Sequence, residues 1–189
     1  MRIISGTHRG KKITAPLSLP VRPTTDRAKE GLFNSLGHRF DFSKLRVLDL
    51  FSGTGNLSYE CASRSAAEIV AVDLHKGACN FISKTANELG FPIVVQCKDV
   101  FEFLNRPNHH HFDLILGDPP YDIGTDKYIT IINAVISHPT LLSERGILIL
   151  EHASSDSLES HPNFTQKKKY GSSTFSWFEK KAGHKPDSV

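Results

Sequence analysis

The chain has 189 residues, of which 39% are hydrophobic and 23% charged, a balance typical of one soluble globular domain. This length accommodates one α/β domain with a small appendage and excludes two full domains. No apolar stretch is long enough to cross a membrane and no signal-peptide pattern opens the chain, so we expect a cytoplasmic protein without a membrane partner. Three unpaired cysteines, Cys61, Cys79 and Cys97, fit a reducing compartment and are expected to be small core residues.

The formal net charge of +3 conceals an asymmetry, because residues 1–30 carry seven Lys or Arg against two acidic residues. Short β-like pieces around 1–4 and 12–15 flank a turn rich in glycine and cations. They predict a hairpin that presents Arg9, Lys11 and Lys12 and that is too small to stand alone. Such a basic arm points to a polyanion, most plausibly nucleic acid, although a solvated terminus would carry the same charge.

A proline-rich linker and a helix complete the predicted N-terminal unit, residues 1–40. Thr24 or Thr25 is expected to cap the helix, which runs to about Leu36. Its apolar residues Ala28, Leu32, Phe33 and Leu36 fall on one face, and we expect Arg27, Lys29 and Glu30 to point elsewhere.

Residues 41–182 are predicted to form the main domain, followed by a polar tail at 183–189. Strands are expected at 46–50, 68–73, 92–97, 112–117 and 146–150, and helices around 57–62, 76–89, 99–104 and 126–136. Alternating strands and helices predict an α/β fold with a doubly wound, Rossmann-like parallel sheet. Two further strands, 164–170 and 174–179, have no helix between them and predict an antiparallel hairpin that closes one edge of the sheet.

The strand at 112–117 ends in Asp118, Pro119, Pro120 and Tyr121. Proline cannot donate ladder hydrogen bonds, so the strand stops there, at the sheet edge where open α/β sheets bind ligands. The exocyclic amine of a nucleobase is a poor nucleophile. The Asp118 carboxylate and the Pro119 carbonyl can each accept one of its N–H bonds and direct its lone pair, while the Tyr121 ring stacks on the base. The alternative is that Asp118 merely opens a turn.

A second group of candidates follows the first strand, in Asp49 to Gly55. Gly53 and Gly55 predict a tight turn that lets the backbone approach a ligand closely. The third glycine of the dinucleotide fingerprint is missing, because Ser58 occupies its place. Asp49 would repel a pyrophosphate and suits a ligand with a cationic amino-acid end.

Aspartates also end the next two strands. Asp73 is placed to bind both hydroxyls of a ribose, and Asp99, with the backbone of Val100, to meet an adenine amino group. Each aspartate alone equally suits a helix N-cap. Together with Asp49 they indicate a nucleoside with a positive tail and no phosphate, which describes S-adenosylmethionine and not NAD.

These motifs, DLFSGTG, Val72-Asp73, Asp99 and DPPY, resemble those of Rossmann-like, S-adenosylmethionine-dependent amino-methyltransferases. The opening RIISGTHRGKKI and RPTTDRAKEGLFN resemble the bacterial RsmD-like family, and the resemblance runs to about residue 151. It implies methylation of the guanine N2 amine in small-subunit (16S) ribosomal RNA, with that RNA or the assembling small subunit as partner. The implied cofactor contacts are Asp49, Phe51, Gly53, Gly55, Asp73, Leu74, Asp99 and Val100, and by analogy Arg22 and Thr24. We expect a monomer.

Three features are given no catalytic role. Adjacent histidines at 109–111 cannot all aim at one tetrahedral ion, so we interpret them as a loop and expect no metal. Lysines 167–169 are interpreted as a solvated edge, with RNA contact as the alternative. Trp177 and Phe178 are adjacent in a strand, so only one can face the core, and the other is expected under a neighbouring loop.

Two other functions compete with this interpretation. DNA methyltransferases acting on adenine N6 or cytosine N4 also use a DPPY-type turn, but 189 residues leave no room for a separate sequence-reading domain. A non-catalytic RNA-binding protein of ribosome assembly would not require the cofactor motifs.

Overall fold

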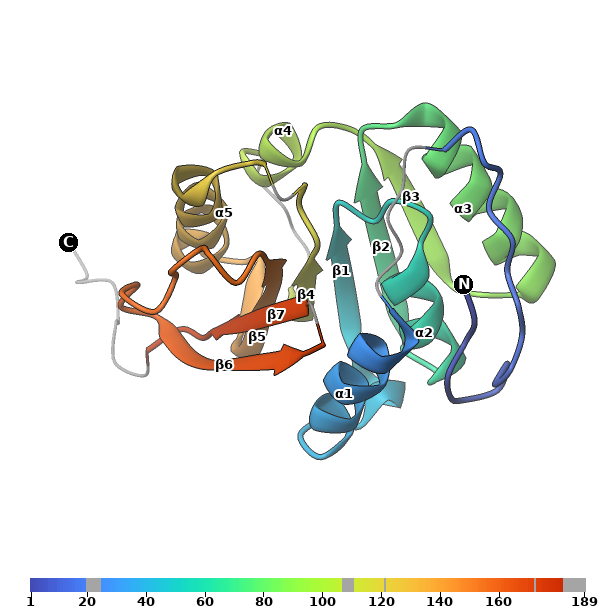
Figure 1. Cartoon of the computed structure of the whole chain (residues 1–189), viewed down its shortest axis with the longest axis horizontal. Coiled ribbons are helices and arrows are strands. Elements are labelled where there is room, and N and C mark those ends of the chain that lie inside the picture. Colours follow the sequence, from blue (N-terminus) through green and yellow to red (C-terminus); the bar gives the residue numbers. More distant parts are fainter. Residues whose placement is uncertain (20–24, 107–110, 121, 172, 182–189) are drawn as a thin grey trace.

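The computed structural model describes residues 1–19, 25–106, 111–120, 122–171 and 173–181. Its centre is a seven-stranded sheet of order β3-β2-β1-β4-β5-β7-β6 (Figure 1). The strands are β1 (Arg46–Leu50), β2 (Glu68–Asp73), β3 (Ile93–Cys97), β4 (Phe112–Gly117), β5 (Leu142–His152), β6 (Phe164–Tyr170) and β7 (Ser173–Phe178). The first five pair in parallel, and β7 pairs antiparallel with both β5 and β6. The predicted doubly wound sheet and antiparallel C-terminal hairpin are confirmed.

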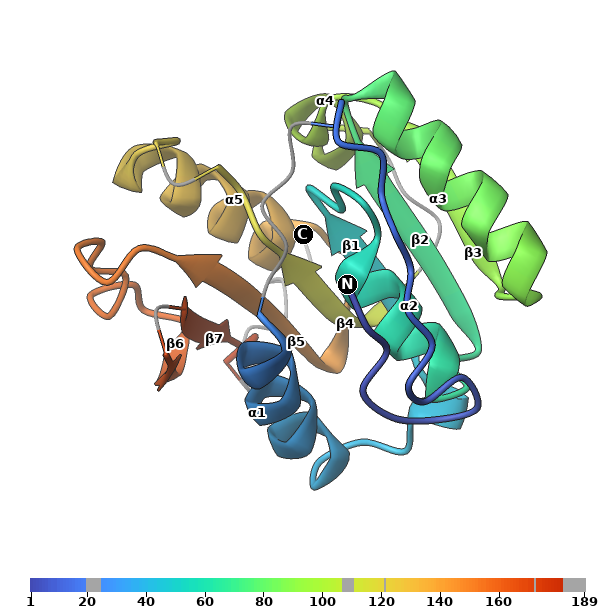
Figure 2. The same cartoon turned by 45° about the vertical axis from the view of Figure 1, so that its right-hand side comes forward.

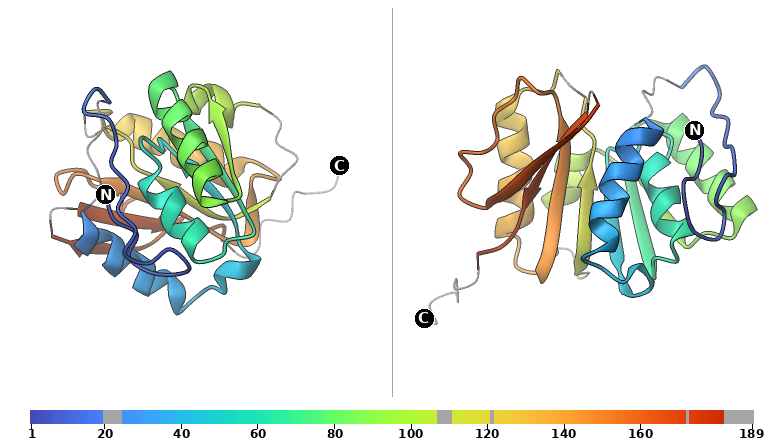
Figure 3. Two further views of the ribbon diagram at one scale, coloured as in Figure 1. Left: turned by 90° about the vertical axis from the view of Figure 1, so that its right-hand side faces the viewer. Right: turned by 60° about the horizontal axis from the view of Figure 1, so that its bottom comes forward.

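Helices cover both faces of this sheet. They are α1 (Asp26–Gly37), α2 (Asn56–Ser63), α3 (Lys76–Leu89), α4 (Val100–Leu104) and α5 (Thr125–Ser137), with a short 3-10 turn at Phe42–Lys44. The first three helices lie on one face and α4 and α5 on the other (Figure 3). A hydrophobic core lies on each face of the sheet, and successive residues of β1 pack into opposite cores. Val47 packs beneath α1 and α2, and Leu48 packs beneath α4 and α5. None of the described helices has the length and apolarity needed to cross a bilayer.

Residues 1–19, here called the arm, form the predicted hairpin in a minimal version. Its only β-bridge among the described residues joins Arg2 to Lys12, flanked by a bond from the Ile13 N–H to the Met1 carbonyl (3.0 Å). Ile3 and Ile13 are buried in the same cluster as side chains of α2 and α3. The hairpin has no core of its own and is stable because it docks beside α2 (Figure 2).

The predicted apolar face of α1 is confirmed, but Lys29 is not oriented away from the core as predicted. Thr25 caps the helix by accepting the Ala28 N–H at 3.2 Å, and Thr24 lies outside the described residues. Lys29 is only 1% exposed, so the prediction that it points away from the core was wrong. It precedes Leu32 and Phe33 by three and four residues and therefore shares their face. Arg27 and Glu30 are exposed as predicted.

Three other predictions meet a clear outcome. Trp177 and Phe178 are both buried, on opposite faces, and the ring of Phe178 lies 5.8 Å from that of His161 in the preceding loop. Strand β5 starts at Leu142, earlier than the predicted residue 146, because its first pair, with Phe112, precedes a bulge. Cys97 is exposed, which contradicts its predicted place in the core.

Candidate cofactor and base-amine site

The predicted cofactor and amine-binding residues that follow β1, β2, β3 and β4 lie along one edge of the sheet, where the winding changes direction. Strand β1 pairs in parallel with β2 on one side and with β4 on the other. The carboxyl ends of β1 to β4 therefore share one edge, with Leu50 opposite Val72 and Gly117. A switch point of this kind is the usual ligand site of an open α/β sheet.

The loop from β1 to α2 has the tight backbone that its glycines predict. Gly55 adopts φ +83°, and a Cβ at this position would meet the Tyr59 ring at 2.8 Å. Phe51 adopts φ +58° although it is not a glycine, a conformation that is costly and concentrates at functional sites. Its ring packs edge-on against Phe101 of α4, at a centroid distance of 6.5 Å. The loop is thus held in a specific, strained shape against α4.

Asp73 fastens this loop to the end of β2. Its Oδ2 accepts the Gly53 N–H at 2.7 Å, and its Oδ1 accepts the His75 N–H at 2.8 Å. Each carboxylate oxygen has a second lone pair, so two ribose hydroxyls can still be accepted. Leu74, the next residue, is 67% exposed and offers apolar surface at the same edge.

Asp49 lies beneath the loop and not on its open side. The residue is 1% exposed, and its Oδ2 accepts the Ser58 hydroxyl at 2.5 Å and the Ser58 N–H at 3.1 Å. Burial raises the pKa of the Asp49 carboxyl to about 7, against the opposing effect of the Ser58 bonds. Ser58 occupies the place of the third glycine of the dinucleotide fingerprint. Its hydrogen bonds to Asp49 connect α2 to β1.

Asp99 is the N-cap of α4. Its Oδ1 accepts the N–H groups of Phe101 at 2.8 Å and Glu102 at 3.1 Å. The capping role considered for each aspartate is therefore the observed one here, and the adenine contact stays a prediction. Val100 is buried in the core beneath α4 and α5, so its backbone, not its side chain, would meet a base.

Asp118 stands at the end of β4, on the other side of β1. Its N–H donates to the Leu50 carbonyl at 3.3 Å, which extends the β1–β4 pairing to the start of the turn. Pro119 is buried and Pro120 exposed, and a bond from the Ile123 N–H to the Pro120 carbonyl (3.0 Å) closes the turn. The Asp118 carboxyl is thereby fixed on a stiff support beside the glycine loop. Tyr121, Arg22 and Thr24 lie outside the described residues.

The cations of the arm are exposed, but they are spread along α2. A bond from the Thr7 N–H to the Ser63 carbonyl (2.7 Å) places the hairpin turn, and with it Arg9, at the end of α2 far from the glycine loop. Lys12 instead borders a pocket of about 700 Å³, together with Thr54 of the glycine loop. Of the three predicted RNA-binding cations, Lys12 is therefore the one at this pocket, whose lining also includes Arg2.

Sequence reasoning missed two groups near the site. Lys127, exposed in the first turn of α5, holds its Nζ 4.8 Å from the Phe101 ring centroid. The buried Lys29 lies between α1, α2 and the arm. The helical spacing signalled the second, but nothing local in the sequence signals the first.

The family described as Conserved hypothetical protein 95 has a model that matches residues 1–179 of this chain. The chain belongs to this family. It is the RsmD-like family that the N-terminal stretches and DPPY resemble. Ribosomal RNA small subunit methyltransferase D of Haemophilus influenzae is 37% identical over 125 residues, which are 64% of this chain and 64% of that protein. Its namesake in Buchnera aphidicola is 29% identical over 168 residues, 88% of this chain and 85% of that protein.

Among solved structures, the Thermus thermophilus 16S rRNA N2 G1207 methyltransferase RsmC, in complex with AdoMet and guanosine, superposes with a TM-score of 0.68. The match covers 86% of this chain and 45% of RsmC at 24% identity, so it concerns the fold alone. This chain thus has the Rossmann-like sheet of solved methyltransferases, with its C-terminal strands in the order β7-β6.

Proposed function

We propose that this chain is an S-adenosylmethionine-dependent methyltransferase that modifies the N2 amine of a guanine in small-subunit (16S) ribosomal RNA. The observation that carries the proposal is the position of Asp118. Its backbone is bonded to Leu50, the residue that leads into the glycine loop, so an amine acceptor and the cofactor loop are neighbours. Family membership supports the substrate class, because the relatives are ribosomal RNA methyltransferases by name.

The residues at the cofactor edge fit S-adenosylmethionine better than a dinucleotide. The positive φ angles of Gly53 and Gly55 bring bare backbone to the edge, and Asp73 offers acceptors for ribose hydroxyls. Asp49 and Asp73 both oppose a pyrophosphate at this loop, whereas they favour a cationic amino-acid end. When bound, the cofactor supplies an electrophilic methyl group on a sulfonium sulfur.

The chain contributes orientation and placement. The Asp118 carboxylate and the Pro119 carbonyl accept the two N–H bonds of the guanine amine and turn its lone pair toward the methyl carbon. Tyr121 stacks on the base and keeps it out of its helix. Transfer of the methyl group to this nitrogen would release S-adenosylhomocysteine, and the displaced amine proton would pass to the Asp118 carboxylate or to water. Holding both partners in line supplies most of the rate, as in other reactions of two bound substrates.

The proposed division of the chain follows from these roles. Residues 1–40 dock RNA, residues 41–182 form the catalytic domain, and the protein works as a cytoplasmic monomer on RNA or on an assembling subunit. Only the DPPY turn supports the alternative of a DNA methyltransferase. A non-catalytic RNA-binding protein would have no need of the strained cofactor loop at Phe51.

A methyl-transfer assay with tritiated S-adenosylmethionine tests the proposal. Naked 16S RNA, 30S particles and duplex DNA are offered separately, because the sequence does not distinguish the first two. The expected result is label in small-subunit RNA in one or both RNA forms and none in DNA. Label in DNA alone would establish the rival enzyme, and binding to 30S particles without any transfer would establish the assembly protein.

A further inference from the structure

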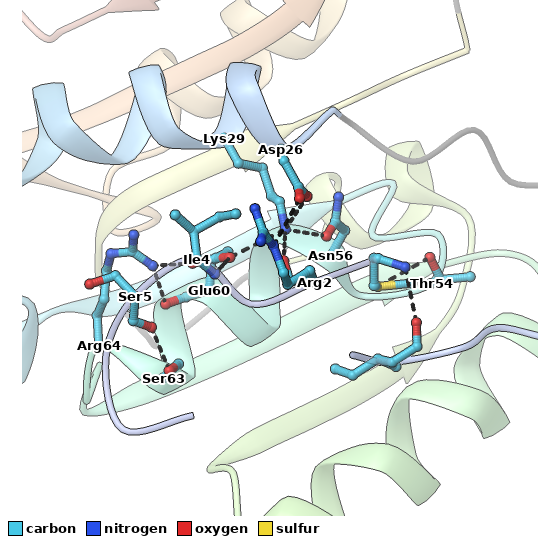
Figure 4. Close-up of polar contacts among 12 residues, drawn as sticks. Arg2, Ile4, Ser5, Asp26, Lys29, Thr54, Asn56, Glu60, Ser63 and Arg64 are labelled. Atoms are coloured by element: carbon cyan, nitrogen blue, oxygen red, sulfur yellow. Dashed lines mark hydrogen bonds and ion pairs between the residues drawn. The ribbon is translucent and has the colours of Figure 1, made fainter. Parts of the chain in front are cut away.

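A buried charge cluster joins the arm to α1 and α2. The Lys29 side chain extends from α1 into the space between the arm and α2 (Figure 4). Its Nζ donates to the Arg2 carbonyl at 2.5 Å, to Asn56 Oδ1 at 2.9 Å and to Glu60 Oε1 at 3.2 Å. Burial lowers the pKa of Lys29, and the adjacent Glu60 carboxylate opposes that shift. One ammonium group on α1 therefore contacts two other segments of the chain, the arm and α2.

Glu60 makes the complementary contacts. It is fully buried, and its Oε1 also accepts the Ile4 N–H of the arm at 2.6 Å, while its Oε2 pairs with Arg64. Farther along α2, the Ser63 hydroxyl donates to the Ser5 carbonyl at 2.6 Å. The arm is thus held at its backbone by buried side chains of α1 and α2. Of its own basic side chains, Arg2 adds an exposed ion pair with Asp26 of α1, at 3.1 Å.

Stability alone does not account for a buried ion pair at this place. Removing two charges from water is costly, and an apolar pair of similar volume often serves folding as well or better. The rest of this face of α1 is built in that apolar way, with Leu32 and Phe33 in the core. Unlike an apolar pair, Lys29 and Glu60 make directional hydrogen bonds, and these bonds fix the position of the arm backbone.

We propose that Lys29 is a positioning residue for RNA binding. With Glu60 it clamps the arm to α2 at Arg2 and Ile4, so that Arg2 and Lys12 stay on the wall of the pocket beside Thr54. The inference rests on the proposed function only for the identity of the ligand, an RNA whose phosphates the arm cations meet.

The glycine loop has its own supports, which predicts a selective effect. The Gly55 N–H donates to Ser52 at 2.7 Å, Gly53 is bound by Asp73, and Ser58 is bound by Asp49. Lys29 takes part in none of these bonds. Releasing the arm is therefore expected to weaken RNA binding and to leave cofactor binding nearly unchanged, whereas general destabilisation would affect both.

The test uses the double variant K29M/E60L in the full chain. Removing both charges together avoids leaving either Lys29 or Glu60 unpaired in the core, and the two contacts of this pair with the arm are lost. Arg64 keeps the Glu60 backbone carbonyl at 3.1 Å and the Phe33 ring as partners. The matched control is R39M/E179L, which removes an ion pair with a 2.7 Å contact between the end of α1 and the C-terminal hairpin, remote from the arm. Hydrogen exchange of arm amides, S-adenosylmethionine affinity, and kcat and KM for RNA are measured for each.

We expect the double variant to fold, its arm amides to exchange at least tenfold faster, and its RNA KM to rise about tenfold, with kcat and cofactor affinity within about threefold. The control is expected to match the wild type in arm exchange and RNA KM. Unchanged arm exchange would overturn the clamp, and faster exchange with an unchanged RNA KM would overturn its role in RNA binding. If the wild type methylates no RNA, the proposed function fails, while RNA binding and exchange still decide the clamp.

Discussion

The two sides of the candidate site are built differently. On the cofactor side, Asp49, Asp73 and Asp99 all accept hydrogen bonds from neighbouring backbone or from Ser58, so each of them shapes the protein before any ligand arrives. On the amine side, the shape of the turn comes from the strand pairing of Asp118 and from two prolines. Carboxylates at the same edge of the sheet therefore differ in what their removal is expected to do. Cofactor-side changes are expected to disturb fold and binding together, whereas the turn that carries Asp118 is supported by its backbone N–H and by the prolines.

Asp118→Ala tests the amine side and has the largest expected effect. Losing one oriented acceptor costs ~2.7–4 kcal/mol in the transition state, which corresponds to a turnover lower by about 100- to 1,000-fold. Cofactor affinity is expected to stay within about threefold, since the proposed partner of the Asp118 carboxylate is the base and not the cofactor. Steady-state kinetics and calorimetry measure the two effects, with Asp122→Ala, an exposed carboxylate of the same loop, as the control. Retention of more than a tenth of the turnover would count against the orienting role.

Asp73→Ala tests the cofactor side. Removing two ribose acceptors is expected to weaken S-adenosylmethionine binding by roughly 2–4 kcal/mol, with a smaller effect on saturated turnover. Because Gly53 and His75 lose their acceptor as well, the free energy of unfolding should fall by about 1–3 kcal/mol. Asp73→Asn keeps one acceptor and should recover part of the stability. Unchanged cofactor affinity in calorimetry would remove Asp73 from the site.

The free energy of unfolding is expected to depend on pH through the buried carboxyl of Asp49. Its pKa is raised to about 7 by burial, so the folded protein binds a proton that the unfolded chain releases near pH 4. The contribution of the protonated Asp49 carboxyl to the free energy of unfolding is fully present below pH 4. It is lost as the pH rises to about 7, at up to ~1.4 kcal/mol per pH unit. Asp49→Asn should lack this slope. Denaturant unfolding of both proteins between pH 5 and 8 measures it, and parallel curves would show that Asp49 is already ionised at pH 5.

The arm has the smallest expected effects. Replacing Arg9, Lys11 and Lys12 with Ala should leave thermal stability and cofactor binding almost unchanged, because all three side chains are exposed. The salt dependence of RNA binding should flatten by up to ~2 units of slope, at ~0.7 per lost contact on single-stranded RNA. Among the single variants, Lys12→Ala should weaken binding more than Arg9→Ala, since of these three residues Lys12 alone borders the pocket near the glycine loop. Coincident slopes for wild type and triple variant would exclude the arm as the RNA-docking surface.

Much of this architecture could be predicted because it is local. Apolar strand runs and helical spacing place nearly every element, and Gly90 ends α3 in the left-handed conformation expected of a helix stop. Lys29 was misplaced because its charge was weighed above its helical spacing, and its partner Glu60 is 31 residues away. The hydrogen bonds of Asp49 and Asp73 likewise depend on the loop conformation, which residue types do not encode. The sequence therefore identified the carboxylates at this edge of the sheet but not the hydrogen bonds by which they also stabilise the fold.

The identity of the methylated nucleoside tests the central claim most directly. 30S particles or 16S RNA are incubated with S-adenosylmethionine and either wild type or Asp118→Ala, and the RNA is digested to nucleosides for mass spectrometry. The account predicts N2-methylguanosine with the wild type and about a hundredfold less with Asp118→Ala. Methylation of adenine N6 or cytosine N4, or N2-methylguanosine formed equally by both proteins, would contradict it.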